Sequence, residues 1–421
     1  METDVLIVGV GAAGLMAARE LATAGKKVTI LEARDRIGGR IYPLSEKDFG
    51  YSAQGGAEFM HGDAPISHAL LTEAGLTFTH PIEWWSVLDG EPRVNETISP
   101  HDPILEAKLL ELTEDMTVAE FFDRFFNDTK YDALRKLIYR RLEGYSAADP
   151  SKSSAFALRD ELTDEHAWKQ NNLKESYSKL LSFFEAEAAQ LGIDILLSKV
   201  VTDIHVSGNE AYIKTADGPV YTAKKVIVTV PLPIIKTLHI TPPIPDKIKA
   251  AASMGYGSVL KILLRFKTKW WAGALEQNFE RMFYMFSYEA IPTWWTQYPE
   301  TYITLTGWLA GPKAEALADT SDAELQKIAL SSLSNIFKVS IEQLEGELVA
   351  AKFVNWSKDP YARGAYSYST PESDAARIEL NKPVEDTLYF AGEAISQTAE
   401  SGTVEAALSS GLETAHKILG Q

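Results

Sequence analysis

The sequence predicts an α/β fold that opens with a βαβ unit of the Rossmann type. Residues 5–8 and 28–32 are apolar runs typical of buried parallel strands, and residues 12–24 between them have helical periodicity. Strand-like segments return at 193–230 and at 388–391, after long stretches of other structure. The chain has 421 residues, which is more than one hydrophobic core usually holds, so a second region is expected.

Three glycines lie at the turn between the first strand and the first helix. Gly9, Gly11 and Gly14 have the spacing G-x-G-x-x-G, in which the first glycine permits a tight turn, the second lets a pyrophosphate approach the backbone, and the third lets helix and strand pack closely. The helix N-terminus offers free N–H groups to the phosphates. Glu32 ends the second strand, where a carboxylate accepts hydrogen bonds from a ribose and repels a 2′-phosphate. The pattern predicts FAD or NAD, and not NADP, as the ligand.

Two more glycine-rich segments follow the βαβ unit. Residues 34–40, Arg-Asp-Arg-Ile-Gly-Gly-Arg, combine a second close backbone approach with the guanidinium of Arg40, which suits a phosphate oxygen. Residues 54–62 supply further small residues. A flat ring could therefore pack against the backbone of this segment.

The rest of the chain divides into pieces of two domains. Residues 65–191 have mainly helical periodicity, and a proline-rich connection at 241–245 precedes a β-branched and aromatic region at 257–308 that predicts a second sheet. A helix is expected at 403–419. We expect a discontinuous cofactor-binding domain of residues 1–80, 192–250 and 350–421, with an inserted substrate-binding domain of residues 81–191 and 251–349.

Composition excludes several classes of function. The chain has no cysteine, so it can form no disulfide, no thiolate metal site and no thioether link to a flavin, and no metal site is predicted. A net charge of −17 makes nucleic acid a poor partner. The basic cluster Arg135, Lys136, Arg140 and Arg141 is expected to be a solvated helix face. No apolar run reaches the length of a membrane span and no leader is visible at the start, so we expect a cytoplasmic protein without membrane contact.

Ordered motifs along the whole chain resemble those of the flavin-containing amine oxidase family, which includes monoamine, polyamine and L-amino-acid oxidases. These motifs are Gly9 to Gly14, Glu32, Gly38-Gly39-Arg40, Gly55-Gly56-Ala57, Lys261, Trp356 with Asp359-Pro360, Gly364-Ala365-Tyr366, and Tyr389-Phe390-Ala391-Gly392-Glu393. The resemblance implies a glutathione-reductase-type FAD-binding domain with an inserted α+β substrate-binding domain. Monoamine oxidases carry the flavin-linked cysteine where this chain has Ala365, so FAD is expected to be non-covalent.

The resemblance also implies which residues hold FAD. Val201 would contact the adenine through its backbone, Glu393 would lie near the pyrophosphate and ribityl chain, and the helix starting at Thr403 and Val404 would direct its positive end at the flavin pyrimidine. The expected cofactor-binding set is Gly9, Gly11, Ala13, Gly14, Glu32, Ala33, Arg34, Gly39, Arg40, Gly56, Ala57, Glu58, Val201, Trp356, Tyr361, Gly392, Glu393, Thr403 and Val404.

Five residues are candidates for the chemistry. Lys261 begins an apolar strand and, on its own, would be interpreted as a solvent-facing lysine, but its surroundings match the family segment whose lysine holds a water at flavin N5. Trp356 and Tyr366 fall where the family places aromatic walls beside flavin and substrate. His61 resembles the tunnel histidine of polyamine oxidases, with a structural loop histidine as the alternative. Thr403 stands where monoamine oxidases have the second tyrosine of their aromatic cage.

The sequence favours an amine oxidase that acts on a di- or polyamine or an alkylamine, with O₂ as electron acceptor. An L-amino-acid oxidase is a second possibility, which Phe59 disfavours because amino-acid oxidases carry a carboxylate-binding arginine there, although another arginine could substitute. An FAD-dependent desaturase or oxidase of an apolar substrate and a non-catalytic flavoprotein are the remaining alternatives. The tryptophan pairs at 84–85, 270–271 and 294–295 could line a cavity, but most are expected to be core residues.

Overall fold

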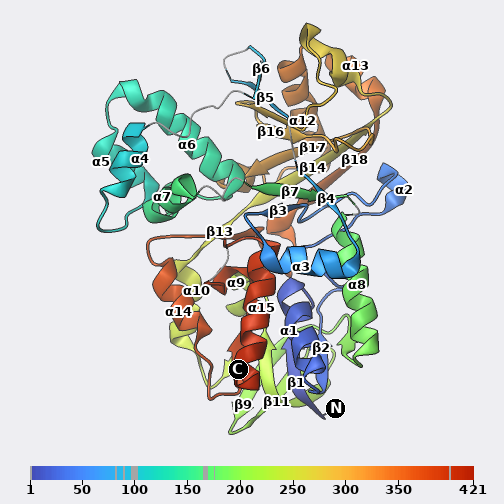
Figure 1. Ribbon diagram of the computed structural model, residues 1–421, viewed down its shortest axis with the longest axis vertical. Helices are drawn as coiled ribbons and strands as arrows, with labels where there is room; N and C mark the ends of the chain where they lie inside the picture. The colour runs from blue at the N-terminus through green and yellow to red at the C-terminus, as the bar shows by residue number, and fades with distance from the viewer. Residues whose placement is uncertain are drawn as a thin grey trace.

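The computed structural model describes residues 2–80, 83–88, 91–95, 103–164, 169–174, 176–397 and 400–421. In Figure 1 an α/β layer structure with the chain termini occupies the lower part of the molecule. A largely antiparallel sheet with its helices lies at the upper right, and a lobe of helices lies at the upper left.

The lower part is built on an eight-stranded sheet of order β12-β9-β10-β11-β1-β2-β8, with β20 also paired to β11. β1 pairs in parallel with β2 and β11, β2 with β8, and β11 with β20, whereas β9 and β10 form an antiparallel hairpin beside β11. The strand bounds are β1 Glu2–Val8, β2 Val28–Leu31, β8 Asp194–Leu196, β9 Val201–Ser207, β10 Glu210–Thr215, β11 Val220–Val228, β12 His239–Thr241 and β20 Leu388–Phe390.

Strand β1 is buried on both faces, as a parallel strand between two helical layers must be. Val5 and Ile7 face one core, which contains α1 (Ala12–Thr23), α3 (Pro65–Ala74), α8 (Ser176–Gln190) and α15 (Val404–Leu419). Leu6 and Val8 face the other core, which contains α9 (Leu232–Ile235), α10 (Pro245–Ser253) and α14 (Ser373–Asn381). The predicted strand–helix–strand unit and C-terminal helix are therefore confirmed, with boundaries within a few residues of those expected.

The second sheet has seven strands in the order β18-β14-β17-β16-β15-β5-β6, antiparallel except for the β15–β5 pair. Its strand bounds are β5 Trp84–Val87, β6 Arg93–Val94, β14 Val259–Phe266, β15 Tyr284–Ser287, β16 Thr293–Trp295, β17 Thr304–Ala310 and β18 Leu348–Asn355. Helices α11 (Pro312–Ala316), α12 (Asp322–Phe337) and α13 (Ile341–Glu347) accompany it, and α12 and α13 pack their apolar faces against this sheet. The predicted second sheet is confirmed.

The helical lobe contains α4 (Pro103–Leu110), α5 (Val118–Phe125), α6 (Asp132–Tyr145) and α7 (Ala155–Thr163), which share a core of phenylalanine and leucine side chains. Two small sheets connect the parts. One is β3 (Phe59–His61), β7 (Gln170–Leu173) and β4 (Phe78–Thr79), and the other is β13 (Gly255–Gly257) with β19 (Tyr366–Tyr368). A short helix, α2 (Glu46–Phe49), precedes β3.

Part of the region predicted to be helical is instead sheet. β5 and β6 join the second sheet, where β5 pairs with β15 about 200 residues away in sequence, and β7 pairs with β3 and β4. These strands are short, so their periodicity could not distinguish them from helix turns. Pairing with distant strands, such as that of β5 with β15, determines that these segments are strands.

The division into two domains stays a prediction. Helix α8, which that prediction places in the substrate-binding domain, packs with α1 in the first core. We therefore propose to group residues 176–190 with the cofactor-binding pieces. Among the described helices, none is both long and apolar enough to cross a bilayer.

Candidate active site

A large cavity of about 1770 Å³ is lined by residues of both sheets and of the helical lobe. The carboxyl ends of the parallel strands open into it, since Gly9 follows β1, Glu32 follows β2 and Thr229 follows β11. Ligands of open α/β sheets bind at this edge. The volume exceeds the roughly 300–1,000 Å³ typical of small-molecule pockets, as expected for a dinucleotide together with a substrate.

The glycine-rich turn has the geometry that a pyrophosphate requires. Gly9 has φ of +106°, which favours glycine, and a Cβ on Gly14 would lie 2.1 Å from the Gly9 carbonyl oxygen. A Cβ on Gly11 would meet no protein atom within 4 Å, and Gly11 lines the cavity. Gly14 therefore permits close packing, while Gly11 leaves open space in front of the N-terminus of α1. These are the separate roles that the spacing predicts.

Glu32 and Arg34 lie at the adenosine end expected for FAD. Glu32 is buried, and its two oxygens accept hydrogen bonds from the backbone N–H groups of Val10 (2.9 Å) and Arg34 (2.8 Å). The Arg34 guanidinium forms two hydrogen bonds, of 2.7 and 2.6 Å, with Asp359, and it lies over the ring of Tyr361. This pairing fixes Arg34 on the cavity wall.

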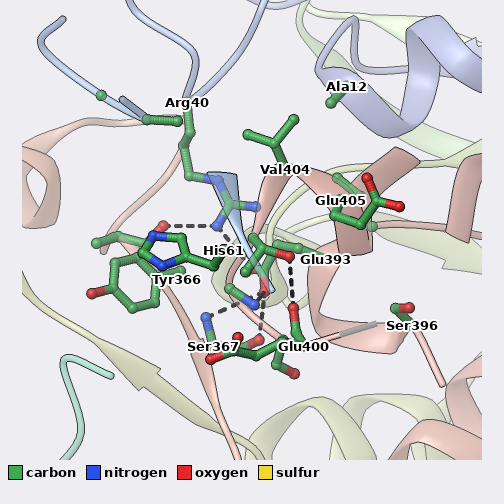
Figure 2. Close-up of a pocket in the computed structure, with 18 of the residues that line it drawn as sticks. Ala12, Arg40, His61, Tyr366, Ser367, Glu393, Ser396, Glu400, Val404 and Glu405 are labelled. Atoms are coloured by element: carbon green, nitrogen blue, oxygen red, sulfur yellow. Dashed lines mark hydrogen bonds and ion pairs between the residues drawn. The ribbon is translucent and has the colours of Figure 1, made fainter. Parts of the chain in front are cut away.

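Glu393 connects three segments around the middle of the cavity. Its carboxylate accepts hydrogen bonds from Arg40 (2.8 Å), from the Ser367 hydroxyl (2.5 Å) and from the Gly402 backbone N–H (2.9 Å), and Figure 2 shows this network. Arg40 also donates to the Ala365 carbonyl oxygen at 2.7 Å. The network holds the glycine-rich segment, β19 and the turn before α15 in one arrangement.

Helix α15 begins at the cavity wall. The Thr403 hydroxyl accepts a hydrogen bond from the Ala406 N–H (3.0 Å) and donates to the Glu400 carbonyl oxygen (2.7 Å), so Thr403 caps the helix. Thr403, Val404 and Glu405 line the cavity, and the Glu405 carboxylate also caps α3 by accepting hydrogen bonds from the N–H groups of Ile66 and Ser67. The positive end of a 16-residue helix therefore faces the cavity.

Lys261 is buried at the wall of the cavity and is not the solvent-facing lysine that an isolated strand-end pattern would suggest. It lies on β14 with its side chain 1% exposed, and its ammonium donates to Glu58 (2.6 Å) and to the Gly56 carbonyl oxygen (3.0 Å). The pKa of Lys261 is below its ordinary value, because burial penalises the ammonium more than the neighbouring Glu58 carboxylate stabilises it.

Aromatic side chains and His61 line the space beside Lys261. Trp356 donates from Nε1 to the Gly55 carbonyl oxygen (3.1 Å), and the Tyr366 hydroxyl donates to the Tyr145 carbonyl oxygen (2.7 Å). His61 lies 3.2 Å from the Tyr145 hydroxyl through Nδ1, and both His61 and Tyr366 line the cavity, as labelled in Figure 2. Burial lowers the pKa of His61 to about 4, which makes it a neutral imidazole near pH 7.

The structure thus brings together all the predicted site residues around one cavity, apart from Gly14, which packs beneath the turn. Other lining residues were not identified from the sequence. Among them are Tyr145, Glu161, Tyr284, Phe286, Trp308 and Glu400. Of the tryptophan pairs, Trp84 and Trp295 line the cavity, whereas the other members are absent from its wall.

The expectation of a solvated basic face was wrong for two of its four residues. Arg140 and Arg141 line the cavity, because this side of α6 faces the second sheet instead of solvent. Arg141 donates from Nε to Glu161 at 2.9 Å. Arg140 lies over the rings of Phe286 and Tyr288, at 5.2 and 5.6 Å.

Comparison with known proteins decides the family. Residues 12–419 match the family described as flavin containing amine oxidoreductase. The chain belongs to this family. The predicted family and fold class are thereby confirmed, and FAD is the implied cofactor.

The names of similar proteins refer to different substrates. Human "Lysine-specific histone demethylase 2" is 27% identical over 99% of this chain, and "Polyamine oxidase 4" of Oryza sativa is 28% identical over 98%. The chain spans 88% of the polyamine oxidase but only 53% of the human demethylase. Among solved structures, putrescine oxidase bound to putrescine (TM-score 0.81, 20% identity) and cyclohexylamine oxidase from Brevibacterium oxydans (TM-score 0.82, 19% identity) share the fold over the full length of both chains.

Proposed function

We propose that the chain is an FAD-dependent amine oxidase that oxidises a C–N bond of a primary or secondary amine. FAD, when bound, supplies the hydride acceptor at N5 and passes the electrons to O₂. For a primary amine, the overall reaction converts amine, O₂ and water into aldehyde, ammonia and H₂O₂. The single observation that carries the proposal is the buried Lys261 ammonium on the wall of a cavity that begins at a dinucleotide-binding turn.

The residues of the chain would hold FAD without a covalent bond. The turn at Gly9 and Gly11 and the N-terminus of α1 suit the pyrophosphate, Glu32 suits the ribose, and the N-terminus of α15 suits the flavin pyrimidine. Ala365 has no group that could attach to a flavin, and the chain contains no cysteine. Both features support a dissociable cofactor.

The protein's own task is to present a neutral amine. An alkylamine resembles lysine, with a reference pKa near 10.4, so neutralising it at pH 7 costs roughly 4–5 kcal/mol unless the site lowers its pKa. The aromatic walls formed by Trp356, Tyr366 and Trp295 exclude water, and desolvation disfavours the ammonium. His61, being neutral, adds no positive charge that would repel the substrate before it loses its proton.

The substrate class that we propose is a di- or polyamine or an alkylamine. The cavity wall carries the carboxylates of Glu161 and Glu400, and Figure 2 shows Glu400 at the cavity next to the start of α15. Although Glu400 is open to solvent on one side, partial desolvation by the surrounding protein and the negative charge of Glu161 raise its pKa to about 7. A second ammonium near Glu400 would stabilise its ionised carboxylate. The similarity to polyamine oxidases supports the same substrate class.

Anaerobic reduction of the flavin tests this function. The purified holoenzyme is mixed with diamines, polyamines, alkylamines and amino acids in turn, and the loss of flavin absorbance is followed. We expect bleaching by amines, followed by H₂O₂ release when air is admitted. If no amine bleaches the flavin, although dithionite does, the proposal is wrong.

Arg140 favours one second candidate, an amino-acid oxidase. Its guanidinium lines the cavity, has no hydrogen bond or ion pair to any described residue, and has an Nε that is buried without a partner. Burial lowers its pKa to about 10. A substrate carboxylate would supply the missing counter-charge. In the panel above, bleaching by amino acids that is lost in Arg140→Gln would select this candidate.

Two further predictions from the sequence remain predictions. A cytoplasmic location and the absence of nucleic-acid partners rest on the composition alone. Fractionation of cells that express the chain would test the location.

A further inference from the structure

Glu58 lies between the large cavity and a second, small one. The small cavity has a volume of about 30 Å³, and Glu58 is part of the wall of both. A cavity needs roughly 10–15 Å³ to hold one water molecule, so this space accommodates one or two. Its wall also includes the exposed residues Lys174 and Glu300. It therefore connects buried Glu58 with the molecular surface.

The carboxylate of Glu58 is held from both sides. Oε2 accepts the 2.6 Å hydrogen bond from Lys261, while Oε1 accepts hydrogen bonds from Trp295 Nε1 (3.1 Å) and Gln297 Nε2 (2.9 Å). Trp295 lines the large cavity and Gln297 lines the small one. These three donors fix the carboxylate in one orientation, with Lys261 at Oε2 and Gln297, a residue of the small cavity's wall, at Oε1.

Lys261 depends on this carboxylate for its charge. An ammonium has three N–H donors, of which two bind Glu58 and the Gly56 carbonyl oxygen, and no described residue accepts the third. Glu58 is the charged group that opposes the effect of burial on Lys261. The other titratable groups that face Glu58 are Tyr51 and Tyr284, whose hydroxyls are neutral because burial and the charge of Glu58 both raise their pKa values.

We propose that Glu58 positions Lys261 and is the route by which Lys261 exchanges its proton with solvent. One proton moves from Nζ to Oε2 along their hydrogen bond, which leaves a neutral amine and a neutral carboxylic acid. The acid then gives this proton to water in the small cavity, and the reverse sequence restores the ammonium. Only N–H and O–H bonds change. The route matters because FAD and substrate together would close the large cavity. The purpose of the route rests on the proposed function, but the exchange of the proton itself does not.

The first test measures the charge of Lys261 without flavin or amine. FAD-free protein is labelled with limiting acetic anhydride across a range of pH, and peptide mass spectrometry gives the pH at which Lys261 becomes reactive. In Glu58→Gln we expect this pH to fall by at least about one unit, because the counter-charge is lost. In Glu58→Asp the carboxylate is one methylene farther from Lys261, so the pH at which Lys261 becomes reactive should fall by less.

Glu347→Gln is the matched control for this measurement. Glu347 lies next to the sheet that contains Lys261. It accepts hydrogen bonds from the Thr268 hydroxyl (2.8 Å) and backbone N–H (3.0 Å), and it lines neither cavity. It should leave the labelling pH of Lys261 unchanged. If Glu58→Gln fails to fold, the smaller shift in Glu58→Asp decides the question. An unchanged labelling pH in the folded variants overturns the positioning role.

The second test concerns the route. Reoxidation of the flavin by O₂ is followed by stopped flow in H₂O and in D₂O, after reduction by dithionite so that no amine is needed. Glu58→Gln should slow this step by about tenfold or more and enlarge its solvent isotope effect. The double variant with Lys261→Met should be no slower than Lys261→Met alone, because the two residues act in series. The route is refuted if the two substitutions slow reoxidation multiplicatively in the double variant, or if Glu58→Gln keeps the wild-type solvent isotope effect. Failure of every amine to bleach the flavin would refute the proposed function and leave both tests intact.

Discussion

Replacing Gly11 with alanine should separate cofactor binding from folding. At this position φ is −75° and ψ is −176°, which alanine adopts without strain, and the added Cβ would touch no protein atom within 4 Å. The methyl group would instead occupy the space where a pyrophosphate approaches the backbone. A charge-assisted hydrogen bond contributes about 1.5–3 kcal/mol, so the loss of one weakens FAD binding by roughly 10- to 150-fold.

The stability of the FAD-free protein should change little. Replacing glycine stabilises by about 0.4–1 kcal/mol through the unfolded chain, but Gly11 is the N-cap of α1, where glycine is preferred to alanine, so the two effects oppose each other. Gly14→Ala is the contrasting variant, because its Cβ would lie 2.1 Å from the Gly9 carbonyl oxygen, and such overpacking destabilises by about 1–3 kcal/mol. Gly346→Ala is the control, since it also has no neighbour within 4 Å and lies outside the cavity.

The assay is titration of the FAD-free proteins with FAD, followed by flavin fluorescence, together with thermal unfolding at zero and saturating FAD. Wild type at 100 times Kd gains about 2.7 kcal/mol from FAD, and Gly11→Ala should gain much less at the same concentration. If Gly11→Ala binds FAD as tightly as wild type, no phosphate approaches this turn and the assignment of the cofactor site is wrong. If it loses as much stability without FAD as Gly14→Ala does, the space before Gly11 is not open.

Three further predictions concern the chemistry. Lys261→Met should slow flavin reduction or reoxidation greatly while retaining FAD, and wild-type turnover in that variant would remove Lys261 from the mechanism. FAD should appear in the supernatant after acid precipitation, because Ala365 offers no attachment point, and flavin that stays with the washed precipitate would contradict non-covalent binding. KM for a diamine, relative to a monoamine of equal length, should fall as pH rises through about 7, because Glu400 has a raised pKa and ionises only there. Glu400→Gln should abolish this dependence, and a variant that keeps it would show that another group titrates.

The cofactor end of the site could be predicted because its signals are local. The three glycines and Glu32 lie within 24 residues, and each has its role in one short strand–turn–helix–strand unit. A turn of this kind requires particular backbone angles and close approaches, which restrict the residue type strongly at Gly9 and Gly14. Such restrictions are visible in a single sequence.

The substrate end could not be predicted in the same way. Arg140 and Tyr145 belong to a helix whose sequence does not show which of its polar faces is turned toward a cavity. Trp295 and Glu58 meet only because β16 and the segment before β3 are brought together across more than 200 residues. The burial of Lys261 followed from resemblance and not from its strand pattern, which would place such a lysine in solvent. These features depend on tertiary packing, which periodicity does not encode.

The flavin content of the purified protein tests the central claim most directly. We expect a yellow protein that loses its flavin to acid, regains it from added FAD and is bleached anaerobically by an amine. A colourless protein that cannot take up FAD would contradict the claim that this cavity, with its glycine turn at one end and Lys261 on its wall, is a flavin site.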